Sequence, residues 1–269
     1  MARFDNHRIL ITGAGAGIGS LMAEEFARKG AEVIVTARRI SAAREVADRI
    51  KVAGGKAHPY VLDVSKLASI AKFRDKLHAD LGPITGLINN AGVVFGGEFE
   101  QVDLEQHLNT FRINSEGLMA TTHAFLDDLI SAKEGYLVNI ASASAFVGLP
   151  YGSTYAASKW AVVGFSESIR LELDVRKIKH VHVTTVCPSY ISTGMFDGVK
   201  TPMFTPMLTP EKVVKSILRG MQKNDSFVIE PAIAKSTELL KAALPRKAWD
   251  EVAYRIGVST SMYSWKGKK

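Results

Sequence analysis

The sequence predicts an α/β protein built on a doubly wound, mostly parallel seven-stranded sheet with helices on both faces. Short runs rich in β-branched residues alternate with helix-length segments, as in successive β-α-β units. These runs are nearly continuous in apolar residues, which is typical of strands covered on both faces. No Pro/Gly/Ser-rich linker or internal repeat divides the 269 residues, so we expect one domain, 1–269.

Each expected strand is followed by a helix-length segment or an irregular one, and right-handed crossovers between parallel strands give the doubly wound arrangement. The expected strands are RILIT (8–12), EVIVTA (32–37), AHPYVLDV (57–64), GLINN (86–90), GYLVNIAS (135–142), VHVTTVC (181–187) and SFVIE (226–230). One long segment, 194–210, is rich in Pro and Met and predicts an irregular loop. Loops of that length in a compact domain are usually functional or mobile.

Composition and charge limit the class of protein. Cys187 is the only cysteine, which excludes an internal disulfide and any multi-cysteine zinc site and fits a reducing compartment; we expect it in a buried strand. The first residues are polar and no apolar run reaches membrane-spanning length, so we expect a cytoplasmic protein without a membrane span. The net charge of +7 is spread without basic clusters, which favours a solvated surface over nucleic-acid binding. No metal site is expected.

Four glycines alternate between the first expected strand and the amphipathic helix that follows it: Gly13, Gly15, Gly17 and Gly19. The dinucleotide pattern G-x-G-x-x-G is not met, because its last glycine falls on Ile18 or Ser20. Even so, glycines let a turn adopt positive φ and let a phosphate approach the free N–H groups of the helix start. Glycines also form tight turns without a ligand, so this loop alone does not establish a phosphate site.

Tyr155 and Lys159 are four residues apart in an expected helix, so their side chains share one face. A free tyrosine has a pKa of ~10, and acid-base work near neutrality requires a shift of about three units, or ~4 kcal/mol. One cation ~4 Å away contributes ~4 kcal/mol at an effective dielectric constant of about 20. Lys159 could therefore make Tyr155 acidic enough for catalysis.

These motifs together resemble the short-chain dehydrogenase/reductase family, in its compact single-domain branch with a Rossmann-type fold. The resemblance rests on T-G-x-x-x-G-x-G from Thr12, NNAG from Asn89, and YAASK from Tyr155, in register along nearly the whole chain. It implies a catalytic set of Asn114, Ser142, Tyr155 and Lys159. It further implies cofactor contacts from Gly13, Gly15, Gly17, Ile18, Gly19, Arg38, Asp63, Val64, Asn90, Ala91, Gly92, Tyr155, Lys159, Pro188 and Thr193.

The same resemblance implies a role for each catalytic residue. Tyr155 exchanges a proton with the substrate oxygen, Ser142 holds that oxygen, Lys159 also binds the nicotinamide ribose, and Asn114 positions a water that connects Lys159 to solvent. Ser144 is a rival hydroxyl, and Ser142 is preferred because of its spacing from Tyr155. The sequence departs from the family after Pro188, where Ser189 replaces the usual glycine and leaves the path of that loop open.

The end of the second expected strand favours NADP(H) over NAD(H). An acidic residue there would bind the ribose hydroxyls of NAD, but Ala37 stands near that position and is followed by Arg38 and Arg39. A guanidinium suits a 2′-phosphate by charge and by its forked donors. Alternatively, these arginines are solvated residues at the sheet edge.

Two later segments suggest the substrate. Segment 190–212 carries several Met and Phe residues and is expected to form a lid over an apolar pocket, although these residues could simply cover the sheet. The carboxyl-terminal extension, 232–269, resembles that of retinol and hydroxysteroid dehydrogenases. We therefore expect a small-molecule substrate, a bulky apolar ketone or secondary alcohol (steroid-, retinoid- or aromatic-like). A β-ketoacyl thioester reductase and a non-catalytic nicotinamide-binding regulatory protein are the alternatives.

The expected helix that carries Tyr155 also suggests self-association. Ala157, Ala161, Gly164 and Ser168 form a stripe of small residues opposite Tyr155 and Lys159. Such a stripe fits either a subunit contact or packing within the chain. We expect a homodimer or homotetramer.

Overall fold

All seven strands of the sheet are parallel, in the order β3-β2-β1-β4-β5-β6-β7. The computed structural model describes residues 4–267, so the first three residues and the last two lysines of the expected domain lie outside the described part. The strands are β1 (Arg8–Ile11), β2 (Glu32–Ala37), β3 (Lys56–Val61), β4 (Gly86–Asn89), β5 (Gly135–Ile140), β6 (Val181–Pro188) and β7 (Phe227–Glu230). The predicted doubly wound fold is confirmed.

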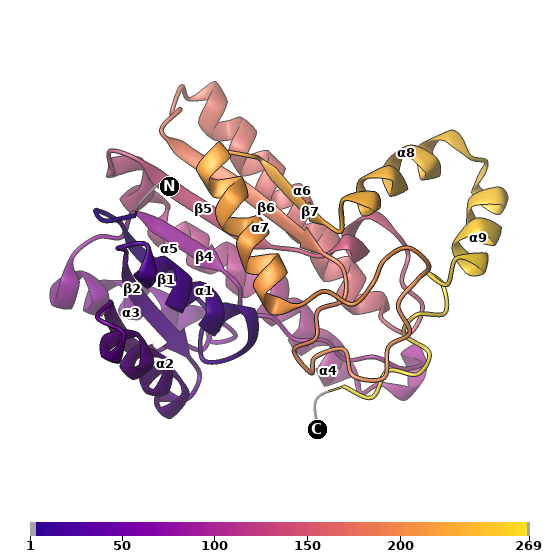
Figure 1. Ribbon diagram of the computed structural model, residues 1–269, viewed down its shortest axis with the longest axis horizontal. Coiled ribbons are helices and arrows are strands. Elements are labelled where there is room, and N and C mark those ends of the chain that lie inside the picture. Colours follow the sequence, from indigo (N-terminus) through magenta and orange to yellow (C-terminus); the bar gives the residue numbers. More distant parts are fainter. Residues whose placement is uncertain (1–3, 268–269) are drawn as a thin grey trace.

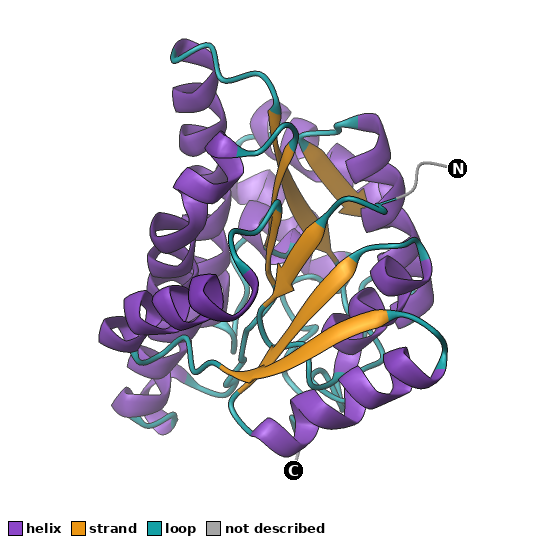
Figure 2. Cartoon of the chain, turned by 90° about the vertical axis from the view of Figure 1, so that its left-hand side faces the viewer, coloured by secondary structure: helices purple, strands orange, loops and turns teal. Residues whose placement is uncertain are grey.

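Helices cover both faces of the sheet (Figure 2). One face carries α1 (Gly17–Arg28), α2 (Ile40–Val52) and α7 (Pro210–Lys223), and the other carries α3 (Leu67–Leu81), α5 (Gly117–Ser131) and α6 (Ser153–Val175). Successive residues of a strand point to opposite faces. Ile9 and Ile11 of β1 accordingly lie in the first core cluster, whereas Leu10 lies in the second. This two-sided burial explains why the strands are continuous in apolar residues.

The remaining elements surround the carboxyl ends of the strands. They are η1 (Phe99–Gln101), α4 (Leu104–Phe111), the π-helix η2 (Arg112–Glu116), η3 (Ala143–Phe146), η4 (Ala232–Lys235), α8 (Ser236–Ala243) and α9 (Arg246–Arg255). Helices α8 and α9 stand away from the sheet (Figure 1). After α9 the chain returns beside the loop between β6 and α7, where Met203 N–H donates to Ile256 O at 2.8 Å.

Two boundaries differ from those expected from the sequence: the start of α7 and the end of β3. The Thr209 hydroxyl accepts the N–H of Lys212 and Pro210 occupies the first turn, so α7 begins inside the predicted lid 190–212 and the irregular part ends at 209. Strand β3 ends at Val61, two residues before Asp63, so Asp63 and Val64 belong to the following loop. In that loop the Asp63 carboxylate accepts the N–H and the hydroxyl of Ser65, which forms a local turn.

The strand order fixes where a ligand can bind. The chain winds outward from β1 through β2 to β3, then crosses back to β4 on the other side of β1. The crossovers therefore leave β1 and β4 in opposite directions, and a crevice opens outside their carboxyl ends. The glycine-rich turn follows β1 and the NNAG segment follows β4, so both border this crevice.

Candidate active site

The turn between β1 and α1 is shaped to receive a phosphate group. Gly13 and Gly17 have φ of 65° and 61°, a conformation that side chains with a Cβ rarely adopt. Helix α1 begins at Gly17, with Ile18 in its first turn, and no side chain caps its N–H groups. A Cβ on Gly17 would meet only the Thr193 side chain, at 3.8 Å. The predicted turn thus carries unhindered donors and the positive end of a helix dipole, which fits a pyrophosphate.

Gly15 and Gly19 serve packing rather than positive φ. A Cβ on Gly15 would lie 2.9 Å from the Ala42 side chain, so this residue lets the turn approach α2. A Cβ on Gly19 would lie 2.5 Å from Asn90 Nδ2 and 2.6 Å from Gly13 O. The four glycines therefore have two roles: they keep the turn open, and they allow its close contact with the segment after β4.

Hydrogen bonds join the first turn to the NNAG segment. The Thr12 hydroxyl accepts the N–H groups of Asn90 and Ala91 at 2.9 and 3.0 Å. In return, Asn90 Nδ2 donates to Thr12 O at 2.9 Å. The two segments that border the crevice are thereby held as one rigid unit.

Asn114 lies in the π-helix η2 and holds the chain just beyond NNAG. Its Oδ1 accepts the N–H of Val93 at 2.9 Å, while its Nδ2 donates to Val93 O and to the Ser158 hydroxyl. A Cβ on Gly92 would lie 3.3 Å from Asn114 Oδ1 and 3.7 Å from Lys159 Nζ. Single π turns inside helices are frequent at functional sites. Here the turn brings Asn114, Gly92 and Lys159 together.

Tyr155, Lys159 and Ser142 meet at the carboxyl end of β5. Helix α6 carries Tyr155 and Lys159 one turn apart, with side chains 6% and 4% exposed. Lys159 Nζ lies 5.8 Å from the centre of the Tyr155 ring and donates to Ile140 O at 2.8 Å. Ser142 lies two residues after the end of β5 and is buried beside the phenol. The structure thus brings the three predicted groups into one site.

Burial controls the charge of both titratable groups. It raises the pKa of Tyr155 above its ordinary value, with a hydrogen bond from Ser142 acting in the opposite direction. It lowers the pKa of Lys159 to about 8. For the chain without a ligand, the expectation that Lys159 makes the phenol more acidic is wrong. The Lys159 ammonium donates to the Ile140 carbonyl, and desolvation dominates at the phenol.

Ser142 and Ser144 differ in their surroundings. The Ser142 hydroxyl accepts the N–H of Ser144 at 3.2 Å and donates to Pro188 O at 3.4 Å, the last residue of β6. Ser144 Oγ is buried and has no partner among residues 4–267. Ser142 is the hydroxyl that acts on the pKa of Tyr155, which supports the preference for it.

The loop after β6 keeps a regular path despite the serine at 189. Ser189 N–H donates to Glu230 O at 2.7 Å, which extends the pairing of β6 with β7. Within the described chain Ser189 is not among the residues with positive φ, so this position does not require glycine. Thr193 follows in a tight turn, its N–H donating to Ile191 O, and lies against Gly17.

The residues expected to bind adenosine lie along the edge of the crevice near β2. Ala37 ends β2 and is buried, whereas Arg38 and Arg39 are exposed and form no ion pair within the described residues. Asp63 is half-buried, and Val64 packs against Gly117 of α5. Two guanidinium groups therefore remain available beside the crevice, and no acid replaces Ala37.

A cavity of about 280 Å³ opens directly onto Ser142 and Tyr155. We call it the inner cavity. Its other walls are mostly apolar and come from three parts of the chain that are distant in sequence. They are Ala143, Ser144, Val147 and Leu149 after β5; Ser189, Tyr190, Phe196, Pro202, Met203, Phe204 and Thr205 after β6; and Ile233, Ala234, Ser236, Thr237, Leu240, Trp249, Val252, Ile256, Val258 and Ser261 from the carboxyl-terminal extension.

Several of these wall residues were not predicted as site residues. Tyr190 donates from its hydroxyl to Ser261 Oγ at 2.7 Å, because Ser261 itself donates to Val258 O. Trp249 is 7% exposed although it lies in the mainly polar helix α9. In the sequence, Trp249 is a large aromatic residue within a mainly polar helix after the last strand, which indicates that its side chain is buried. Its partners could not be identified without the path of the chain.

The arrangement defines a class of protein: a doubly wound nucleotide-binding fold with a buried Ser-Tyr-Lys site at the edge of its crevice. The short chain dehydrogenase family profile matches residues 7–203, and the chain belongs to this family. The chain is similar to human epidermal retinol dehydrogenase 2 (33% identity; 94% of this chain and 83% of the relative) and to human estradiol 17-beta-dehydrogenase 11 (33%; 93% and 83%).

A solved structure supports the same assignment. The short-chain dehydrogenase from Sphingobium yanoikuyae in complex with NADPH is 26% identical, with a TM-score of 0.75 over 89% of this chain and 97% of that one. The protein is therefore an NAD(P)-dependent oxidoreductase that acts on a CH–OH group. None of the helices within residues 4–267 is both long and apolar enough to span a bilayer. Nor do the described residues contain three His, Cys, Asp or Glu side chains grouped around a possible metal site.

Proposed function

We propose that the protein is an NADP(H)-dependent oxidoreductase of bulky apolar ketones or secondary alcohols, of steroid-, retinoid- or aromatic-like structure. The observation that carries the proposal is the inner cavity, in which Ser142 and Tyr155 face an otherwise mainly apolar wall. The names of the two curated relatives, a retinol and an estradiol dehydrogenase, support the same substrate class.

The residues of the site account for the proton chemistry. Bound nicotinamide donates or accepts the hydride. In reduction, the neutral Tyr155 phenol, which burial favours, donates its proton to the carbonyl oxygen, and in oxidation the phenolate takes it back. Ser142 donates a hydrogen bond to the same oxygen and stabilises its developing charge. Lys159 holds positive charge behind the phenol and binds the nicotinamide ribose, while Asn114 fixes this region and positions the water that connects Lys159 to solvent.

The cofactor would lie along the glycine turn and the NNAG segment. Gly13, Gly17, Ile18 and the start of α1 would hold the pyrophosphate, and Asp63 and Val64 would lie toward the adenine. Arg38 and Arg39 favour a 2′-phosphate, because both guanidinium groups are exposed and unpaired among the described residues. Arg38→Asp is expected to weaken NADPH binding by tenfold or more and leave NADH binding nearly unchanged. Titration of both nucleotides against Arg74→Asp, on the surface of α3, provides the control; tighter NADH binding by the unaltered chain overturns the NADP(H) assignment.

An NADPH oxidation screen tests the substrate class. Steroid, retinoid and aromatic ketones are compared with β-ketoacyl thioesters, and turnover of the first group is expected. Turnover of thioesters alone would make the protein a β-ketoacyl reductase. Nicotinamide binding without any turnover would identify a regulatory protein. Neither alternative is favoured by the relatives, which are named as dehydrogenases.

We also propose that segment 190–209 acts as a lid and that the protein forms a homodimer or homotetramer. Phe196, Met203 and Phe204 of this segment line the inner cavity, which supports the lid. Gly164 and Ser168 are exposed on α6, which supports a contact between copies. Light scattering after size-exclusion chromatography tests the oligomer, and a monomer at micromolar concentration would overturn it.

A further inference from the structure

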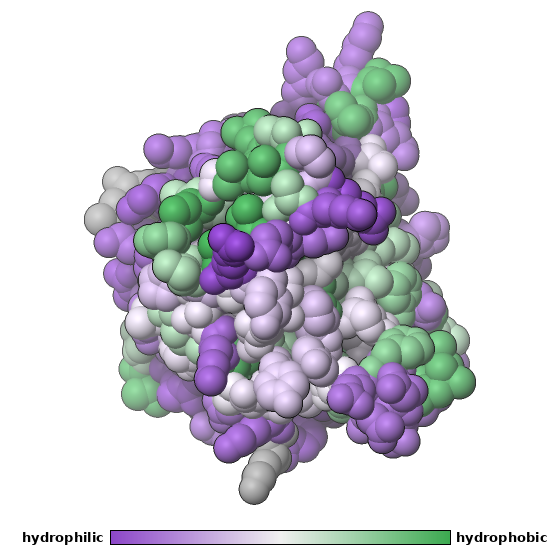
Figure 3. Space-filling view, turned by 90° about the vertical axis from the view of Figure 1, so that its right-hand side faces the viewer, coloured by the Kyte–Doolittle hydropathy of each residue, from purple (hydrophilic) through white to green (hydrophobic). Residues whose placement is uncertain are grey.

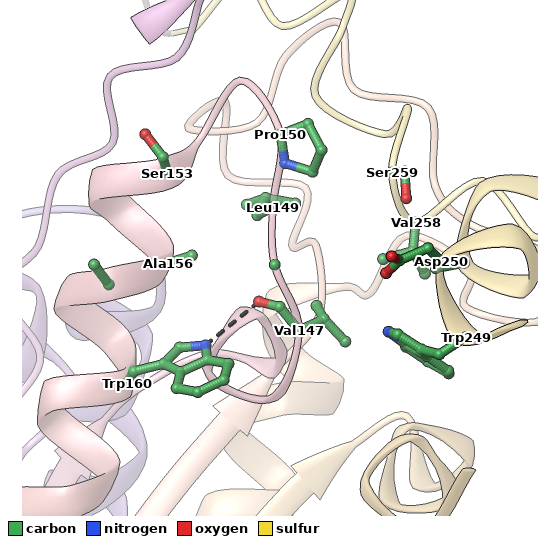
Figure 4. Close-up of a pocket in the computed structure, with 13 residues that line it drawn as sticks. Val147, Leu149, Pro150, Ser153, Ala156, Trp160, Trp249, Asp250, Val258 and Ser259 are labelled. Carbon is green, nitrogen blue, oxygen red and sulfur yellow. Dashed lines mark hydrogen bonds between the residues drawn. The ribbon is translucent and has the colours of Figure 1, made fainter. Parts of the chain in front are cut away.

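A second cavity, of about 690 Å³, lies on the other side of segment 147–149 from the inner cavity. We call it the outer cavity. Its walls come from α6, from α9 and from the segment between η3 and α6, and Figure 4 shows Trp160 and Trp249 on opposite sides of Val147. The complete lining is Val147, Gly148, Leu149, Pro150, Ser153, Ala156, Ala157, Trp160, Trp249, Asp250, Ala253, Val258 and Ser259. This cavity is not needed for the chemistry described above.

Four apolar residues separate the two cavities. Val147, Leu149, Trp249 and Val258 line both of them, so the wall between them is one layer of side chains. Side chains change rotamer far more readily than backbone hydrogen bonds break. Movement of these four side chains would open a passage between the cavities.

Trp249 presents an unused hydrogen-bond donor in this wall. Its indole Nε1 has no hydrogen-bond partner among the described residues, although the residue is 7% exposed. Figure 4 shows the indole nitrogen directed toward Val147 and the cavity. The other cavity tryptophan, Trp160, instead donates to Ser144 O at 2.7 Å. Trp249 Nε1 is not among the buried atoms that lack a partner, so it borders open space, where an oxygen of a ligand or of water can accept its hydrogen bond.

The volumes point to a ligand that occupies both spaces. Pockets that enclose drug-sized ligands measure roughly 300–1,000 Å³. The inner cavity, at about 280 Å³, is at the lower edge of that range, whereas the outer cavity adds about 690 Å³. A substrate that holds its carbonyl at Tyr155 and is longer than the inner cavity would extend into the outer cavity. Figure 3 shows hydrophobic residues gathered on the side of the molecule where α8 and α9 lie.

We propose that the outer cavity is a subsite for the distal part of an elongated, uncharged apolar substrate. The inference rests on the proposed function and specifies its substrate. The apolar part of the substrate passes between Leu149 and Trp249. Trp249 Nε1 donates a hydrogen bond to an oxygen atom of the substrate. The exposed carboxylate of Asp250 lines the outer cavity and repels a substrate that ends in a carboxylate.

Gly148→Phe tests the subsite by turnover. Gly148 is exposed and lines only the outer cavity, a Cβ there meets no atom within 4 Å, and its φ is not positive, so a phenylalanine is accommodated without strain and is expected to narrow the cavity. For a long-chain methyl ketone we expect kcat/KM to fall by about tenfold or more, because several methylene groups lose their contacts. For a short methyl ketone it stays unchanged. Ala79→Phe, on the exposed face of α3, is the matched control. Equal losses for both ketones, or none, overturn the proposal.

A binding measurement separates this proposal from the proposed function. The outer cavity contains two of the three tryptophans, Trp160 and Trp249. A long-chain ketone with bromine at its far end should quench their fluorescence, also in Tyr155→Phe, and Gly148→Phe should abolish this quenching. The same chain ending in a carboxylate should bind more weakly, and Asp250→Asn should reduce that difference. Quenching without turnover of any ketone rejects the proposed function only, whereas turnover without quenching rejects the subsite.

Discussion

At the residue scale, burial of Tyr155 and Lys159 is the main influence on their pKa values. Both side chains are removed from water, which favours the neutral form of each: the pKa of Tyr155 rises and that of Lys159 falls to about 8. Lys159 is tied to the Ile140 carbonyl, so the site is preorganised before a ligand enters. Burial of the Lys159 ammonium with a single carbonyl partner destabilises the folded chain. Groups with perturbed pKa values of this kind are common at functional sites.

Tyr155→Phe is expected to lower kcat by roughly 10²–10⁴-fold, because the variant lacks the proton donor. Cofactor affinity should remain within a few-fold of the unaltered chain. Steady-state kinetics and nucleotide titration measure the two effects. Tyr254→Phe, on the exposed surface of α9, is the control and should have normal activity. Substantial turnover by Tyr155→Phe would exclude Tyr155 as the acid.

Lys159→Met should change how stability depends on pH. Because burial lowers the pKa of Lys159 from 10.5 to about 8, the unfolded chain holds this proton more tightly, and the folded state is destabilised below about pH 8. The shift corresponds to about 3 kcal/mol, and the penalty fades as the pH rises toward the unfolded pKa. The free energy of unfolding of Lys159→Met relative to the unaltered chain should therefore decrease between about pH 7 and pH 10. Denaturant titrations without cofactor give this difference; a constant value contradicts the expectation.

At the element scale, the close approach of α1 to the segment after β4 holds the crevice together. Gly19 allows this approach, and the Thr12 and Asn90 hydrogen bonds fix it. On the opposite face of the sheet, Gly164 of α6 is exposed and has open space around it. A side chain at Gly19 would therefore clash with its neighbours, whereas a side chain at Gly164 would not.

The pair Gly19→Ala and Gly164→Ala tests this difference. Gly19→Ala is expected to destabilise by about 1–3 kcal/mol through overpacking, and to weaken cofactor binding. Gly164→Ala should stabilise by about 0.5–1 kcal/mol, because alanine loses less backbone entropy in a helix. Thermal unfolding with and without nucleotide measures both. Equal effects of the two substitutions would show that the contact at Gly19 is unimportant.

At the scale of the whole molecule, the carboxyl-terminal segment fastens the loop over the inner cavity. Lys200 N–H donates to Ser261 O at 3.1 Å, Lys266 N–H to Asp197 O at 2.8 Å, and Trp265 Nε1 to Met195 O at 3.1 Å. The loop itself is closed at its base by pairing of Ile191 with Leu208. Residues 261–266 therefore hold the loop that lines the inner cavity.

Removal of residues 256–269 is expected to release this loop. The sheet and the glycine turn lie elsewhere, so nucleotide affinity should stay nearly unchanged. For a bulky apolar ketone, KM should rise about tenfold or more, because part of the cavity wall is lost. Kinetics with one small and one bulky ketone measure the effect. Loss of nucleotide binding in the shortened chain would mean that this segment supports the whole fold instead.

Much of the fold and the site follows from local sequence. Apolar runs at the spacing of β-α-β units predict a parallel sheet because buried strands need helices on both faces, and Tyr155 and Lys159 share a face because helical spacing requires it. The preference for Ser142 over Ser144 also agrees with the hydrogen bond that reaches the phenol. These features depend on neighbours within a few residues, or on motifs that follow one another along the chain in the order typical of the family.

Other features depend on residues that are distant in the chain. The direction of the pKa shift of Tyr155 could not be predicted, because it follows from desolvation by packed neighbours and from the Ile140 carbonyl that takes the Lys159 ammonium. Likewise, no local pattern placed Trp249 beside Val147, or Ser261 beside Tyr190.

The sequence by itself determined the order of strands and helices, the glycine turn and the placement of Tyr155 and Lys159 on one helix face, since periodicity and short spacings encode them. Only the tertiary structure decided the shape of the inner cavity and the burial of Tyr155 and Lys159. The shape of the inner cavity depends on the packing of α9 and residues 256–261 beside the segments after β5 and β6, and that packing brings together side chains about a hundred residues apart.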